Sequence, residues 1–149
     1  MRISAKGRYA LAAVVSMAQQ HPQNDGSITL ISISERLGIS KIYLEQVFAL
    51  LKRGELVTSV KGAQGGYQLA RPPRLISALE VLYAVETTLF DKTEDTVAER
   101  SPEIETALRA DVFDALDLAV AEALKQVTIE QLVLSAERRK SANAGMFYI

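Results

Sequence analysis

The chain has 149 residues, of which 48% are hydrophobic and 23% charged. These fractions are typical of one folded domain with an appendage, and they exclude long-range disorder. The chain contains no cysteine and one histidine, so disulfides, thiolate nucleophiles, cysteine-ligated metal sites and histidine clusters are excluded. The lack of cysteine fits a cytoplasmic protein. The sequence contains no run of about 18 apolar residues, so it predicts no membrane span.

Charge is divided unevenly along the chain. Residues 1–78 carry 10 Lys and Arg against 4 Asp and Glu, a net charge of +6, whereas residues 79–149 carry 7 against 14, a net charge of −7. A basic half followed by an acidic half is the layout expected of a DNA-reading lobe joined to a regulatory or dimerisation lobe. The alternative is a chance partition of solvated charge.

Three helices are predicted in the first third of the chain. Helical spacing of apolar residues indicates helices over 4–20 and 30–37, the first capped by Ser4. Gly38 suits the left-handed position that ends a helix, and Ser40 caps a third helix that begins two residues later and stops at Gly54. Two helices joined by a three-residue turn with glycine have helix-turn-helix spacing.

The third helix carries the candidate DNA-reading face. One side of it is apolar and predicts a core face, formed by Leu44, Val47, Phe48 and Leu51. On the opposite side, Ile42 could contact a thymine methyl group and Gln46 an adenine edge in the major groove. Lys41 and Tyr43 flank this face and could reach phosphates. The alternative is an ordinary amphipathic helix with one exposed apolar residue.

A β-hairpin follows the third helix. The β-branched run 56–60 and the alternating run 67–69 predict two strands, with Lys61 and Gln64 at a glycine-rich tip. Such a hairpin directly after a helix-turn-helix forms a wing, whose tip would lie at the DNA backbone or minor groove. The rival interpretation of this tip, an enzyme's phosphate cradle, lacks the Lys-Ser/Thr ending of a P-loop and opens no helix.

The second half of the chain is predicted to form dimerisation helices. A fourth helix covers 77–86, and the aperiodic segment 87–100 predicts a mobile connector. Ser101 caps a long helix with Pro102 in its first turn that runs to about residue 126. Its apolar stripe predicts a two-fold dimer. The alternative is that this helix packs in a bundle within its own chain. The candidate interface residues are Ile104, Leu108, Val112, Leu116 and Val120.

A last helix is predicted from the capping box of Thr128 and Gln131 to about Lys140, followed by a flexible arm. The predicted fold class is therefore mainly α with a small β-hairpin. We expect a winged helix-turn-helix domain at 1–86, a connector at 87–100, dimerisation helices at 101–140 and a tail at 141–149.

Five motifs in register resemble the Rrf2 family of transcription regulators, whose members include IscR, NsrR and CymR. The motifs are residues 4–10 (SAKGRYA), Ser40 with 43–46 (YLEQ), 54–57 (GELV) with Ser59, Gly62 with 65–67 (GGY), and 85–86 (VE). The resemblance implies a homodimeric winged-helix regulator on a palindromic operator, with the third helix in the major groove and the wing in the minor groove. It also implies that Ser4, Lys6 and Arg8 lie near the DNA backbone. We include Ser40, the cap of the third helix, among the expected DNA-binding residues.

The connector departs from the family's cluster-binding members, which carry three cysteines there. This chain resembles instead the cluster-free branch of the cysteine-metabolism repressor CymR, whose members end in residues similar to 146–149. The resemblance implies a repressor of cysteine or sulfur genes without a cofactor of its own, acting with cysteine synthase.

The C-terminal tail gives this partner a physical basis. Ile149 could enter the active site of cysteine synthase, its carboxylate replacing that of the substrate, with Phe147 and Tyr148 at the pocket mouth. The tail could alternatively pack on its own chain. Other interpretations are a winged-helix adaptor without DNA reading, or a regulator that senses a different small molecule. An enzyme is not expected, because the sequence offers few catalytic candidates.

Overall fold

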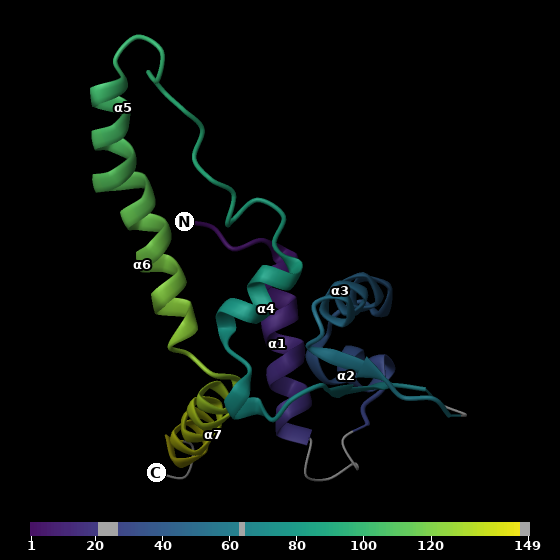
Figure 1. Ribbon diagram of the computed structural model, residues 1–149. Helices are drawn as coiled ribbons and strands as arrows, with labels where there is room; N and C mark the ends of the chain where they lie inside the picture. The colour runs from purple at the N-terminus through teal and green to yellow at the C-terminus, as the bar shows by residue number, and fades with distance from the viewer. Residues whose placement is uncertain (21–26, 63–64, 147–149) are drawn as a thin grey trace.

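The computed structural model describes residues 1–20, 27–62 and 65–146. In chain order the elements are α1 (Ala5–Gln20), α2 (Leu30–Leu37), α3 (Lys41–Arg53), β1 (Val57–Ser59), β2 (Tyr67–Leu69), η1 (Pro73–Leu75), α4 (Ala78–Val85), α5 (Pro102–Leu108), η2 (Arg109–Phe113), α6 (Asp114–Lys125) and α7 (Ile129–Met146). In Figure 1, α1 to α4 and the hairpin gather on one side, and the long helix formed by α5, η2 and α6 in succession stands apart from them. The predicted mainly helical fold with a small hairpin is confirmed.

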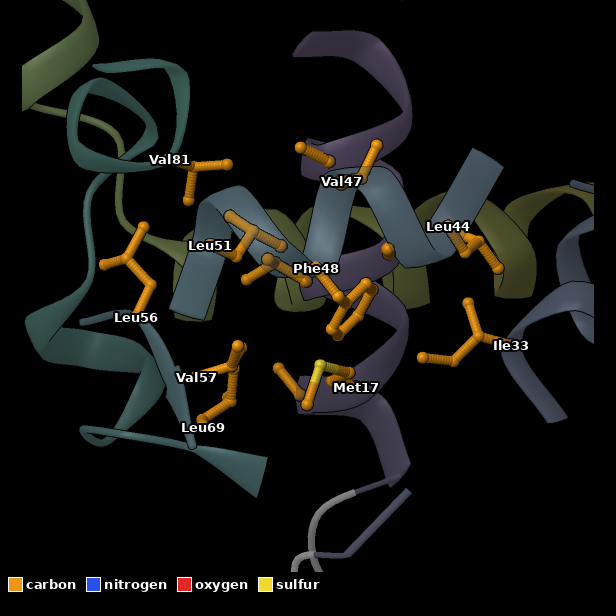
Figure 2. Close-up of a cluster of buried hydrophobic side chains, with 14 of the residues drawn as sticks. Met17, Ile33, Leu44, Val47, Phe48, Leu51, Leu56, Val57, Leu69 and Val81 are labelled. Atoms are coloured by element: carbon orange, nitrogen blue, oxygen red, sulfur yellow. The ribbon is translucent and has the colours of Figure 1, made fainter. Parts of the chain in front are cut away.

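One face of α3 forms the centre of the core. Leu44, Val47, Phe48 and Leu51 are all fully buried, as their spacing predicts. Figure 2 shows Phe48 in the middle of this cluster, close to Met17 of α1. Burial of these side chains fixes the rotation of α3 about its axis, so its opposite face must point away from the core.

The turn between α2 and α3 has the predicted chemistry. Gly38 has a φ of 69° and donates its N–H to the carbonyl of Ser34, a left-handed conformation that glycine adopts without strain. The hydroxyl of Ser40 accepts the N–H of Tyr43 at 3.2 Å. This bond requires helical backbone directly after the cap, so α3 begins at Lys41, one residue earlier than predicted.

The wing contains a third extended segment that the sequence did not predict. β1 pairs antiparallel with β2, Val57 opposite Leu69 and Ser59 opposite Tyr67. Ile28 exchanges two backbone hydrogen bonds with Tyr67, both of 2.8 Å. Ile28 is itself buried, so the base of the wing is anchored to the segment preceding α2.

The long helix is interrupted where the sequence predicts a continuous one. It contains the π-helical turn η2 at Arg109–Phe113, an insertion for which apolar spacing gives no signal. Pro102 lies in its first turn and Ser101 occupies the N-cap position, both as predicted, but the Ser101 side chain makes no capping hydrogen bond. The backbone carbonyl of Ser101 instead accepts N–H groups from Ile104 and Glu105.

The last helix confirms its predicted start and corrects its predicted end. Thr128 and Gln131 exchange the two hydrogen bonds of a capping box, at 3.0 and 3.1 Å. α7 then continues to Met146, through the segment expected to be a flexible arm. That expectation is wrong, since the helix includes Asn143 and Gly145, whose intrinsic propensities oppose helix. Within the described residues, no helix has the combined length and hydropathy needed to cross a bilayer.

Candidate nucleic-acid interface

The outer face of α3 is exposed opposite its buried face. Ile42 is 70% exposed, and Gln46 and Ala49 are exposed with it. Lys41 forms an ion pair with Glu45 at 3.8 Å, with both side chains about half exposed. Such a surface pair contributes little to stability, so Lys41 can exchange Glu45 for a phosphate at small cost.

The N-terminal turn of α1 lies against the start of α3. The rings of Tyr9 and Tyr43 meet edge to face, with centroids 5.1 Å apart. Tyr43 is therefore half-buried and has a packing role that the sequence analysis missed. The contact brings the segment carrying the exposed Arg8 and the half-buried Lys6 next to the candidate reading face.

Ser4 is held by a residue distant in sequence. Its backbone N–H and its hydroxyl both donate to Oε1 of Glu86 at 2.9 Å. Its hydroxyl oxygen also accepts the N–H of Gly7 at 3.1 Å, which confirms the predicted cap of the first helix. Ser4 is exposed beside the start of α1, and both of its hydrogen-bonding functions are already used within the chain.

The wing contributes an exposed cation. Lys61 lies beyond β1 and is exposed, and Val60 and Gly66 close the base of the tip through a 2.9 Å hydrogen bond. Figure 1 shows the hairpin extending away from the body of the domain. Gln64, the other predicted tip residue, lies outside the described residues.

The long helix presents the predicted apolar stripe. Ile104, Val112 and Leu116 are 50%, 50% and 58% exposed, and Leu108 and Val120 are half-buried. Large apolar side chains exposed in a row along one helix mark an interaction surface. The predicted partner-binding residues Phe147, Tyr148 and Ile149 lie outside the described residues.

Proteins similar to this chain are described as transcription regulators. A family profile named Rrf2, described as an iron-dependent transcriptional regulator, matches residues 3–135. The chain belongs to the Rrf2 family. It is 36% identical over 137 residues to the HTH-type transcriptional regulator IscR of Sodalis glossinidius, covering 92% of this chain and 81% of that one. Two other curated relatives are matched over only 53% and 57% of their length.

Solved structures of Rrf2 relatives share the fold over most of the chain. An IscR structure from T. potens has a TM-score of 0.71 at 34% identity and covers 93% of this chain and 90% of its own. CymR, the global cysteine regulator of B. subtilis, has a TM-score of 0.70 at 32% identity, with 91% and 98% covered. These relatives are regulators rather than enzymes, which agrees with the few catalytic candidates that the sequence offers.

The second half of the connector of this Rrf2 chain is bonded to charged side chains of the long helix. Oε2 of Glu105 accepts the backbone N–H groups of Thr96 at 2.9 Å and Val97 at 2.8 Å. Arg109 donates to the carbonyl of Thr93 and to the carboxylate of Asp95, each at 2.9 Å. These contacts attach the second half of the connector to the start of the long helix.

The electrostatics of this attachment favour ionised Glu105. The N–H of Val97, the N–H of Thr96 and the charge of Arg109 hold the pKa of Glu105 below its usual value, and burial only partly opposes them. The iron dependence in the family description raises the question of whether this chain could hold an iron–sulfur cluster. The residues do not fit a cysteine-ligated one, since the chain has no cysteine and Glu105, a carboxylate of this region, is bound to backbone amides.

Proposed function

We propose that the chain binds operator DNA as a homodimer, with α3 in the major groove and the wing tip at the backbone or minor groove. The observation that carries this proposal is the outer face of α3. Ile42 is 70% exposed on a helix whose other face is fully buried, which gives the isoleucine no packing role in its own chain. In a major groove it would contact a thymine methyl group while Gln46 binds an adjacent adenine.

Contacts to the phosphate backbone would come from the elements around this face. Lys41 lies on α3 itself, with Ser40 at its cap, and the Tyr9–Tyr43 contact brings Lys6 and Arg8 near it. Tyr43 would support these contacts mainly by packing. Lys61 would supply a further contact from the wing, with Gln64 beside it in sequence. Phosphate contacts fix the register, and the α3 side chains select the sequence.

The homodimer would form through the long helix. Its exposed stripe, containing Ile104, Val112 and Leu116, would pack against the same stripe of a second copy in an isologous interface. A two-fold dimer would place two α3 helices at the half-sites of a palindromic operator.

We propose repression of cysteine or sulfur genes as the biological role, exercised in the cytoplasm. The similarity to CymR, described as a global cysteine regulator, supports it. Cysteine synthase is the proposed partner, bound through Phe147, Tyr148 and Ile149. Because α7 runs to Met146, these residues directly follow the helix. Calorimetry with cysteine synthase tests this point: deleting Ile149 should abolish binding, and equal affinity after the deletion would reject the partner.

A second candidate is control of iron-related genes, which the family description and the IscR relatives favour. Such control would use a signal other than a cluster held by cysteines of this chain. Genome-wide footprinting separates the two candidates, since the genes beside the bound sites would name the pathway.

A salt titration of operator binding tests DNA recognition itself. A protein that neutralises several phosphates loses affinity with a log–log slope of about −0.9 for each phosphate. We expect a steep slope on the palindromic fragment and a shallower one for Lys61→Ala. A flat slope with weak binding would favour the adaptor alternative.

A further inference from the structure

The contact between Ser4 and Glu86 joins the two ends of the winged domain. Glu86 follows α4 directly, and its N–H donates to the carbonyl of Leu82. Its Oε1 receives two hydrogen bonds from Ser4, whose hydroxyl in turn accepts the N–H of Gly7. The start of α1 is therefore fixed by a residue 82 positions away, and it is the same turn that carries Lys6 and Arg8.

Gly7 provides the space for this contact. A Cβ atom added at Gly7 would overlap Oε1 of Glu86 and come within 2.8 Å of Cγ2 of Ile3. Glycine inside a helix costs roughly 1 kcal/mol relative to alanine. The close approach of the carboxylate gives a physical reason for glycine in this turn of α1.

The charge of Glu86 is unfavourable for DNA binding taken alone. A carboxylate near a phosphate-binding segment repels the phosphates and partly neutralises the surrounding cations. A positive helix N-terminus stabilises such a carboxylate, but stability of the free protein does not remove the repulsion. The two effects on operator affinity, electrostatic repulsion and structural support, have opposite signs and can be separated.

We propose that Glu86 is a positioning residue for the DNA-backbone contacts of Lys6 and Arg8. Resting on the proposed function, this inference assigns the carboxylate the task of holding the first turn of α1 so that both cations, on different sides of the helix end, can reach phosphates. The gain in DNA affinity from a fixed first turn of α1 exceeds the loss from repulsion between the Glu86 carboxylate and the phosphates. Loss of the carboxylate would leave the first turn free to move, and the two cations would lose part of their contacts.

The sign of the change in operator affinity tests the proposal. Full-length protein, Glu86→Ala, Glu86→Gln and the control Glu35→Ala are titrated with a labelled operator fragment over a range of salt concentrations. Glu35 is an exposed carboxylate on α2, so its removal reports the effect of charge alone. Electrostatics alone predicts that Glu35→Ala and Glu86→Ala both bind as tightly as the wild type or more tightly.

Positioning predicts a different pattern. Glu86→Ala should bind about tenfold more weakly despite the lost negative charge, with a salt slope shallower by about 1 to 2 units. Glu86→Gln keeps an acceptor oxygen for Ser4 and should recover most of the affinity. Operator affinity of Glu86→Ala equal to or above that of Glu35→Ala would overturn the proposal.

A second variant tests the same contact without deleting the carboxylate. Gly7→Ala should displace Glu86 and weaken binding. The double variant with Glu86→Ala should lose less affinity than the sum of the two single losses, because only the overlap of the added Cβ with Ile3 remains once the carboxylate is gone. Additive losses would overturn the proposal, since they would show that Gly7 and Glu86 act independently. Thermal unfolding and sedimentation confirm that each variant is folded. Failure of the wild type to prefer the operator would reject the proposed function, which is a different outcome.

Discussion

Replacing Leu116 by aspartate should dissociate the proposed dimer. Burying a whole leucine side chain contributes about 1.5–3 kcal/mol, and Leu116 is 58% exposed in the single chain. Its burial in an interface would therefore contribute about 0.9–1.7 kcal/mol per subunit. Two-fold symmetry doubles this value to about 2–3.5 kcal/mol, before the cost of desolvating two aspartates.

The dissociation constant of the dimer should accordingly rise by about 30- to 300-fold or more. Sedimentation velocity over a concentration series measures this change. Leu118 supplies a matched control, because it is 64% exposed on the same helix but lies about 200° from Leu116 around the axis. Leu118→Asp should leave the dimer intact. Dissociation by Leu118→Asp with an intact Leu116→Asp dimer would refute the assignment of the interface.

Three further predictions concern stability. The folded state lowers the pKa of Glu105, so ionised Glu105 stabilises the fold above the unfolded pKa of about 4.3, and this stabilisation is lost as pH falls through the lower folded pKa. Glu105→Gln should therefore flatten the decline of the unfolding free energy over this acidic range. An unchanged acid transition would contradict this prediction. Glu55 has a φ of 61°, so Glu55→Gly should raise the unfolding free energy by about 0.5–1 kcal/mol in urea, whereas a loss would count against strain at this position. Phe48 is fully buried, so Phe48→Ala should lower the free energy of unfolding by about 3–5 kcal/mol in the same assay. A decrease below about 1 kcal/mol would contradict the central place of Phe48 in the core.

Local chemistry determined the parts of the fold that the sequence predicted well. The turn at Gly38, the cap at Ser40 and the capping box of Thr128 and Gln131 each depend on residues within a few positions of one another. The buried face of α3 could be predicted because, at about 3.6 residues per turn, its large apolar residues fall on one side of the helix. The orientation of the candidate reading face could be predicted for the same reason.

Contacts between distant residues account for most of what the sequence did not show. Ile28 joins the wing through Tyr67, and Glu86 reaches back to Ser4, and neither pairing leaves a local pattern. The connector has no apolar period, so no sequence pattern indicated that the backbone of Thr93 and Thr96 bonds to side chains of the following helix, Arg109 and Glu105. The π-helical turn η2 is similarly invisible to a periodicity argument.

Operator affinity of Gln46→Ala tests the central claim, the insertion of the outer face of α3 into a duplex, most directly. Gln46 is exposed, so its truncation should leave thermal stability within about 0.5 kcal/mol of the wild type. Binding to the operator should weaken by about 1–3 kcal/mol, and the variant should lose discrimination at one A·T base pair in each half-site. Unchanged affinity and unchanged base preference would contradict the claim, because they would show that this face does not enter the groove.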